Sequence, residues 1–212
     1  MSVEEKPMKK VLVTGFAPFG AETVNPSYEA VKLLPDRILD ASIVKAEIPV
    51  VFGQCGQVLA QLMAAEHPDL VLLVGQAGGR SAMEVERVAI NCQDCPPDYP
   101  DNAGAAPVDA AIVPGGPAAY FATLPIKAMV ARMLSQDIPA RISNTAGTYV
   151  CNDLMYRLLH LLATAYPGVK GGFLHVPYAT SQRHPALPSM PLGEIARGLQ
   201  CAIEAMLLPP EP

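Results

Sequence analysis

Lys10 to Gly15 reads K-V-L-V-T-G and is the strongest indication of the fold in this sequence. Its apolar, largely β-branched residues are consecutive and do not alternate with polar ones, which is typical of a strand buried on both faces. Leu70 to Val74 is a second fully apolar stretch, and Gly172 to Val176 is a further predicted strand. Less regular strands are predicted over 41–51 and 140–143. These patterns together favour a mostly parallel sheet.

Segments with helical spacing of apolar residues separate these strands. The predicted helices cover Asn25-Pro26 to about Leu34, Gly53 to Glu66, Ile126 to Gln136, Cys151 to Tyr166, and Leu192 to Leu208. Alternation of strands and helices predicts an α/β fold, a single-domain three-layer α/β/α structure with a mostly parallel, twisted central sheet. No repeat or linker divides residues 1–212, and we expect 1–8 and 208–212 to be flexible tails. A strand near the edge of the protein is predicted over 83–92, followed by a long functional loop with a short hairpin over 95–116.

Composition excludes several classes of partner. The chain has 212 residues, half of them hydrophobic, and a net charge of −5, which argues against nucleic-acid binding. It has no apolar stretch long enough to span a membrane and no signal peptide at its N-terminus. Five cysteines, an odd number without an export signal, predict free thiols in a reducing, cytoplasmic setting.

Cys151 lies at the end of the stretch Ser143 to Asp153, where a strand passes through a tight loop into a helix. Unpaired N–H groups and the helix dipole favour negative charge there, so we expect a lowered thiol pKa and a nucleophilic Cys151. The alternative is a small buried cysteine, which is the more common situation for this residue type. Ligands of such sheets bind beyond the carboxyl ends of the strands, where Phe16, Gln76, Ser143 and His175 are all predicted to lie.

A thiol nucleophile needs a base and a group that orients this base. Of the four histidines, His175 is favoured because it ends an apolar strand, and His184 in a polar loop is the next candidate. His67 lies at a helix end, and His160 lies too far along the helix from Cys151.

The orienting carboxylate is either Glu86 or Glu84, which share one face of a strand, and periodicity does not choose between them. Solvated glutamates are the alternative for both. Gly75 to Arg80 fits neither a P-loop nor a dinucleotide fingerprint. Cys92-x-x-Cys95 lacks the second pair of a zinc site and does not open a helix as a redox motif does.

Several motifs together resemble the pyroglutamyl peptidase type I (pyrrolidone-carboxylate peptidase) family, over Val11 to about Leu207. They are V-L-V-T-G-F-A-P-F-G-A-E-x-x-N-P-S from Val11, G-Q-A-G-G-R from Gly75, E-R-V-A-I-N from Glu86, S-N-T-A-G-T-Y-V-C-N from Ser143 and F-L-H-V-P from Phe173. The resemblance implies an intracellular cysteine peptidase that removes an N-terminal pyroglutamate, with no metal or organic cofactor.

Carried over residue by residue, the resemblance places the nucleophile at Cys151, the base at His175 and the orienting carboxylate at Glu86. It also implies that Phe16, Phe19, Gln76 and Tyr149 contact the substrate ring, with Tyr149 standing where the family often has Phe. Glu84 departs from the family's usual small hydroxyl residue, and the Cys92 to Pro100 segment also differs from it.

The expected partners are peptides with an N-terminal pyroglutamate, with no nucleic acid and no membrane. The family often forms tetramers, so a homo-oligomer, a dimer or a tetramer, is expected, and the run from Gly116 to Leu124 is a candidate interface. Two other functions stay open: a related cysteine amidohydrolase acting on another small cyclic amide, and a non-catalytic homologue that binds pyroglutamate. A redox role of Cys92 and Cys95 is a more distant alternative.

Overall fold

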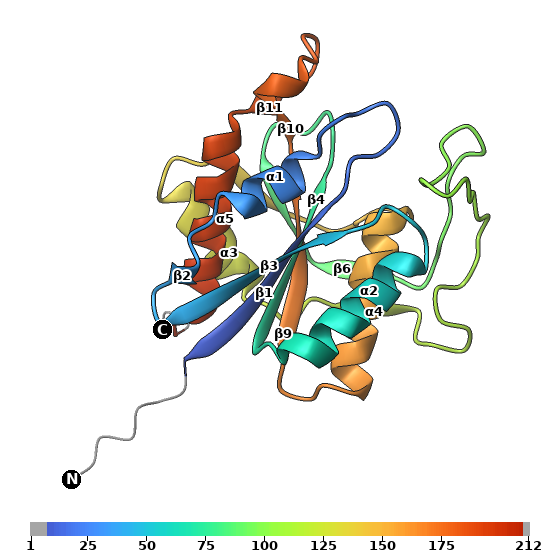
Figure 1. Cartoon of the computed structure of the whole chain (residues 1–212), viewed down its shortest axis with the longest axis horizontal. Helices are drawn as coiled ribbons and strands as arrows, with labels where there is room; N and C mark the ends of the chain where they lie inside the picture. Colours follow the sequence, from blue (N-terminus) through green and yellow to red (C-terminus); the bar gives the residue numbers. More distant parts are fainter. Residues whose placement is uncertain (1–7, 210–212) are drawn as a thin grey trace.

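A seven-stranded sheet forms the centre of the computed structural model, which describes residues 8–209. Its strand order is β2-β3-β1-β4-β9-β5-β8 (Figure 1). The strands are β1 (Lys9–Phe16), β2 (Arg37–Ile38), β3 (Ala41–Ile48), β4 (Leu70–Gln76), β5 (Met83–Glu86), β8 (Ala140–Ser143) and β9 (Lys170–Val176). Neighbouring strands are parallel except in two pairs, β2 with β3 and β5 with β9. The predicted α/β class is confirmed.

Helices cover both faces of this sheet (Figure 1). One face packs against α1 (Pro26–Lys32), α3 (Ile126–Leu134) and α5 (Leu192–Leu207). The other face packs against α2 (Gln54–Glu66) and α4 (Val150–Thr164). In β1, Val11 and Val13 belong to the first apolar cluster and Leu12 to the second, and all three are fully buried. Because both faces of β1 are buried, these three central residues are all apolar, as the sequence predicts.

The direction of β8 contradicts one prediction. β5 is antiparallel to β9, pairing Glu84 with His175, and β8 is parallel to β5, pairing Arg141 with Glu84. β8 therefore runs opposite to β1, β4 and β9, and Ser143 does not leave the sheet at their carboxyl end. The loop 144–149 follows it and leads the chain into α4.

The region after β4 also differs in detail from the prediction. The alternating pattern over 83–92 predicts a strand near the edge of the protein, but β5 lies between β9 and β8 and all four of its residues are buried. The chain then continues as β6 (Val88–Ile90), which pairs with β7 (Ala119–Phe121) in a separate two-stranded sheet. A second small sheet joins β10 (Tyr178–Ala179) to β11 (Ser189–Met190).

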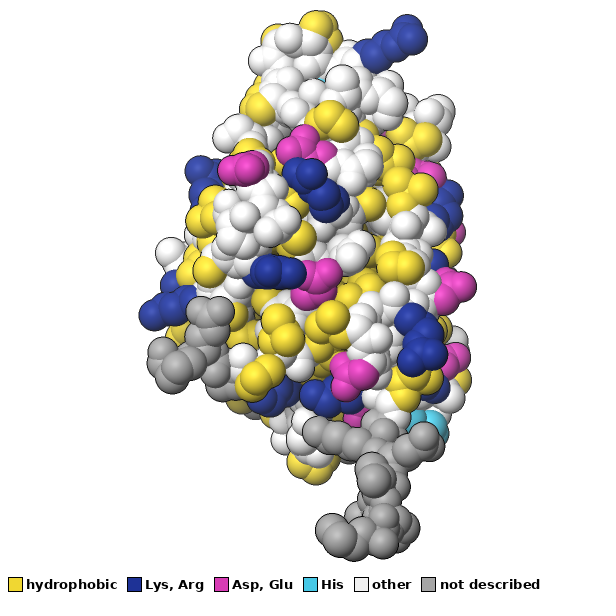
Figure 2. Space-filling view, turned by 90° about the vertical axis from the view of Figure 1, so that its left-hand side faces the viewer, with side chains coloured by type: hydrophobic (Ala, Val, Ile, Leu, Met, Phe, Trp, Pro, Cys, Tyr) yellow, Lys and Arg dark blue, Asp and Glu magenta, His cyan; other side chains and the backbone are white. Residues whose placement is uncertain are grey.

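The surface seen in Figure 2 is mixed in charge, and the described residues begin and end with partly exposed side chains. Figure 2 shows acidic and basic side chains interspersed with apolar ones over one face of the molecule. No helix within residues 8–209 is long and apolar enough to cross a membrane. Of the predicted tails, residues 1–7 and 210–212 lie outside the described residues, while Met8 and Leu208 are about half exposed.

Candidate active site

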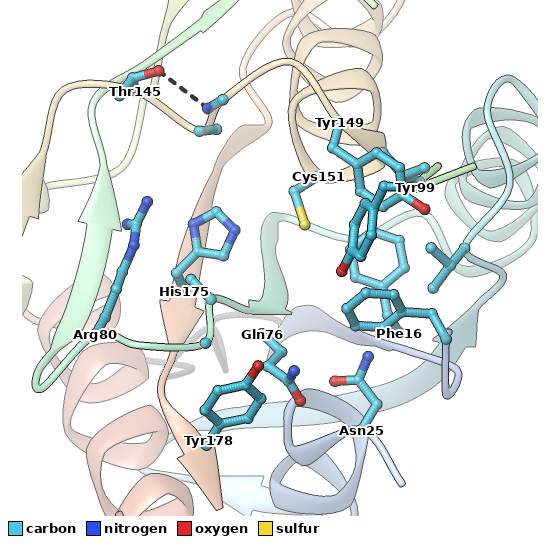
Figure 3. Close-up of a pocket in the computed structure, with 17 residues that line it drawn as sticks. Phe16, Asn25, Gln76, Arg80, Tyr99, Thr145, Tyr149, Cys151, His175 and Tyr178 are labelled. Carbon is cyan, nitrogen blue, oxygen red and sulfur yellow. Dashed lines mark hydrogen bonds between the residues drawn. The ribbon is translucent and has the colours of Figure 1, made fainter. Parts of the chain in front are cut away.

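A cavity of about 360 Å³ lies beyond the carboxyl ends of β1, β4 and β9 (Figure 3). Six of the seven residues predicted to form a site line it: Phe16, Phe19, Gln76, Tyr149, Cys151 and His175. The seventh, Glu86, does not line the cavity and contacts His175. Because these residues come from separate strands, loops and helices, the fold and not the local sequence brings them together.

Cys151 is the second residue of α4, whose N-cap residue Tyr149 is extended and makes no side-chain capping hydrogen bond. The thiol points from the helix start into the cavity, and the imidazole of His175 lies beside it (Figure 3). Gly75, the penultimate residue of β4, lies close to the sulfur: a Cβ at this position would stand 3.0 Å from Sγ and 2.7 Å from the Phe173 ring. Gly75 also pairs with His175 across β4 and β9, so this glycine lets thiol and imidazole approach the same point of the sheet.

The pKa of the Cys151 thiol is raised to about 12, which contradicts the expectation of a lowered value. Burial is the largest cause and the Glu86 charge adds to it, while Arg80 and the Cys151 backbone N–H act in the opposite direction. The helix start therefore does not outweigh the loss of water around the sulfur. Cys151 rests as a thiol in this structure and needs a base to become a nucleophile.

His175 is the histidine that lines the cavity beside this thiol. Its Nδ1 lies 2.7 Å from Oε1 of Glu86, with only 4% of the histidine and none of the glutamate exposed. Burial lowers the pKa of His175, although the hydrogen bond and the charge of Glu86 oppose this shift. The imidazole is thus neutral at pH 7, and because a carboxylate only accepts hydrogen bonds, Nδ1 carries the proton. Nε2 is then free to accept a proton.

Glu84 and Glu86 share one face of β5, and their partners distinguish them. Glu86 contacts His175, whereas Glu84 forms ion pairs with Arg80 and Arg141, the latter with a 2.6 Å hydrogen bond from Nε. Arg80 also reaches Glu86 Oε1 at 3.3 Å. Both glutamates are buried, so the interpretation of either as a solvated residue is wrong.

The other three histidines have different partners. His184 Nε2 lies 2.9 Å from Glu22 Oε1. His160 Nδ1 lies 3.0 Å from the Tyr120 hydroxyl, and His67 ends α2 in a left-handed conformation. None of the three lines the cavity.

Aromatic rings form the wall of the cavity opposite His175 (Figure 3). The Tyr149 ring centroid lies 6.5 Å from that of Phe19, 5.4 Å from that of Tyr99 and 5.3 Å from that of Phe52. The Tyr149 hydroxyl donates to the Pro100 carbonyl at 2.9 Å, which ties the nucleophile loop to the segment that carries Tyr99. Tyr99 and Tyr178 were missed by the sequence prediction. Tyr99 lies in a turn and Tyr178 begins the two-residue strand β10, and neither segment is long enough for periodicity to be informative.

The remaining cysteines lie elsewhere. Cys92 and Cys95 are free, and burial raises the pKa of both thiols. Within residues 8–209, no three His, Cys, Asp or Glu side chains gather in a way that could hold a metal ion.

Known proteins resemble this chain over nearly its whole length. The model of the pyroglutamyl peptidase family matches residues 9–208. The pyrrolidone-carboxylate peptidase of Levilactobacillus brevis is 50% identical over 94% of this chain and 98% of that protein, and the one of Thermosipho africanus is 53% identical over 93% and 97%. The crystal structure of Bacillus amyloliquefaciens pyroglutamyl peptidase I superposes with a TM-score of 0.90 at 46% identity, covering 93% of this chain and 96% of that one. This chain belongs to the pyroglutamyl peptidase family of cysteine peptidases.

Proposed function

We propose that this protein removes an N-terminal pyroglutamate from peptides by acyl transfer through Cys151. One observation carries the proposal: within the described residues, the side chains that line the cavity include the Cys151 thiol and the His175 imidazole but no carboxylate. Among residues 8–209, Arg80 is the one lining side chain with a full charge. A free α-ammonium group would find no anionic partner there, whereas the neutral lactam ring of pyroglutamate needs none.

The aromatic wall suits the ring of this substrate. The lactam is flat, with one N–H donor and one C=O acceptor, and Phe16, Phe19 and Tyr149 offer apolar contact to its carbons. An N-terminal proline lacks the ring carbonyl. Any buried group that pairs with this carbonyl would then lose its partner, at a cost of about 1–3 kcal/mol. We therefore expect prolyl peptides to be rejected.

In the first step, Nε2 of His175 takes the proton of the Cys151 thiol as the sulfur attacks the carbonyl that joins pyroglutamate to the next residue. Glu86, at 2.7 Å from Nδ1, stabilises the imidazolium that forms. Backbone N–H groups at the start of α4 face the developing oxyanion. The imidazolium then gives its proton to the leaving amine, and a thioester between the pyroglutamyl group and Cys151 results.

In the second step, His175 takes a proton from water as the water oxygen attacks the thioester. The C–S bond breaks, the proton returns to the sulfur, and free pyroglutamate leaves. The two steps together consume one water and need no redox partner.

The test is release of a chromogenic amine from its pyroglutamyl amide. We expect turnover by the wild type, none by Cys151→Ala, and unchanged turnover by the matched control Cys92→Ser, because Cys92 does not line the cavity. A wild type that hydrolyses other cyclic amides but not this one would indicate the related amidohydrolase. Binding of pyroglutamate without turnover would indicate a non-catalytic homologue.

We also propose a cytoplasmic location and a homo-oligomer, a dimer or a tetramer. Phe121, in the run from Gly116 to Leu124, supports assembly because 69% of it is exposed in the single chain. Light scattering of the wild type and of Phe121→Ser tests this. A smaller particle is expected for the variant, and a monomeric wild type would exclude assembly.

A further inference from the structure

Gln182 lies outside the cavity but contacts a residue that lines it. It ends the short 3-10 helix Thr180–Gln182 that follows β10. Its Oε1 accepts a hydrogen bond from the Ala179 N–H at 2.9 Å. Its Nε2 donates to Glu22 Oε2 at 3.1 Å and to Gln76 Oε1 at 3.0 Å. Gln182 therefore connects the β1–α1 loop, the end of β4 and the segment after β9.

The chemistry of the partners fixes the orientation of both amides. A backbone N–H can only donate, so Gln182 must turn Oε1 toward Ala179. A carboxylate can only accept, so Gln182 must turn Nε2 toward Glu22, and both constraints agree. The same Nε2 also faces Gln76, and Gln76 must therefore accept this hydrogen bond through its Oε1. The Nε2 of Gln76 is then directed away from Gln182 and, within residues 8–209, donates to no protein acceptor.

We propose that Gln182, held by Glu22, is a positioning residue that sets Gln76 as a hydrogen-bond donor for the ring carbonyl of the substrate. This inference rests on the proposed function and adds the residue that determines specificity for the lactam. Gln76 lines the cavity between Tyr178 and Asn25, on the side that the Cys151 thiol faces (Figure 3). A rotated Gln76 would present Oε1 there and repel a carbonyl oxygen.

Glu22, which accepts a hydrogen bond from Gln182, is also held by a second residue. His184 Nε2 contacts the second oxygen of Glu22 at 2.9 Å, and its ring lies 3.9 Å from that of Tyr178. Tyr178 itself lines the cavity. Glu22 is thus held from two sides, which keeps its Oε2 in place as the acceptor for Gln182.

Gln182→Glu tests the proposal with a side chain of the same shape. One carboxylate oxygen still accepts from Ala179, but the other faces Glu22 and Gln76 Oε1 as an acceptor, so Gln76 is expected to rotate. We expect KM for a pyroglutamyl amide to rise about tenfold with little change in kcat, because the lost contact holds substrate and transition state alike. Gln57→Glu adds the same charge at an exposed position on α2 and should change neither constant.

A double-mutant cycle shows whether Gln182 acts through Gln76. Gln76→Leu removes the donor, so adding Gln182→Glu to it should cost nothing further. The milder Gln182→Met removes the hydrogen bonds without adding charge and should show the same non-additivity with a smaller KM change. Additive effects of the two positions, or a fall in kcat alone, would overturn the proposal.

Binding of 2-pyrrolidone, the bare five-membered lactam, separates this inference from the proposed function. Titration calorimetry measures it without turnover, and Gln182→Glu should weaken it about tenfold. If the wild type binds 2-pyrrolidone but releases no amine from a pyroglutamyl amide, the proposed function fails. The affinity of Gln182→Glu for 2-pyrrolidone then still tests whether Gln182 positions Gln76. Equal affinity of wild type and Gln182→Glu, or no binding by the wild type, would exclude the role of Gln182.

Discussion

Glu86→Gln replaces the carboxylate beside His175 with an amide of the same shape. The wild-type oxygen lies 2.7 Å from Nδ1, is fully buried and faces an imidazole that becomes charged only during the reaction. A hydrogen bond to a charged group contributes about 1.5–3 kcal/mol, which corresponds to a loss of roughly 10- to 150-fold in kcat/KM. If the amide turns its nitrogen toward Nδ1, the histidine takes the wrong tautomer and the loss grows further.

The same variant has a defined effect on the pH profile. In the proposed mechanism neutral His175 is the base, so we expect activity to fall as the pH drops through its pKa. Burial lowers this pKa and Glu86 raises it, so the acid limb of the wild type should lie below pH 6.5. Loss of the Glu86 charge lowers the pKa again. The acid limb of Glu86→Gln should therefore move to lower pH while the maximal rate falls.

Steady-state hydrolysis of a pyroglutamyl amide from pH 4 to 9 measures both effects, with thermal unfolding to show that the variant folds. Glu47→Gln, an exposed carboxylate-to-amide change on β3, is the matched control and should behave as the wild type. A Glu86→Gln enzyme with kcat/KM within threefold of the wild type, or an acid limb that moves to higher pH, would contradict the role proposed for Glu86.

Three further predictions concern the cavity. Gly75→Ala places a Cβ 3.0 Å from the Cys151 sulfur and 2.7 Å from the Phe173 ring, so the thiol and this ring must both shift. We expect kcat to fall about tenfold or more in the same assay, while circular dichroism still shows a folded protein. Tyr99→Ala removes a ring that packs 5.4 Å from Tyr149, and KM should rise several-fold; an unchanged KM would exclude Tyr99 from the substrate wall. Because the Cys151 thiol has a pKa raised to about 12, its alkylation by iodoacetamide, measured against Cys151→Ala, should accelerate with pH up to 9. A plateau near neutral pH would indicate a resting thiolate instead.

Periodicity was informative wherever a residue's neighbours in sequence decide its burial. The run Lys10 to Gly15 predicts β1 because every side chain in the middle of a covered parallel sheet is buried, and Val11 to Val13 are indeed at 0% exposure. Asn25-Pro26 predicts a helix start, and Asn25 does accept the Ser27 N–H at 3.1 Å.

Features that depend on distant residues were not predictable from such patterns. The direction of β8 follows from its pairing with β5, which no local signal encodes. Glu84 and Glu86 have the same parity, and only the placement of Arg80, Arg141 and His175 separates them. The family resemblance, and not periodicity, selected Glu86.

The raised pKa of the Cys151 thiol was also not predictable from the local sequence. A position at a helix start favours the thiolate, and the sequence shows that position. The opposing cost of burial depends on the cavity walls, which come from β1, β4, β9 and the aromatic loops. A nucleophile predicted from its helix position alone is therefore assigned too low a pKa.

The claim that Cys151 carries the acyl group is tested most directly by trapping the intermediate. The enzyme is mixed with a pyroglutamyl ester of a good leaving group, quenched in acid within its first turnover and analysed by mass spectrometry after proteolysis. We expect the mass of one pyroglutamyl group on the peptide that contains Cys151, and none on the same peptide from Cys151→Ala. Turnover with no adduct on Cys151, retained by Cys151→Ala, would contradict the mechanism.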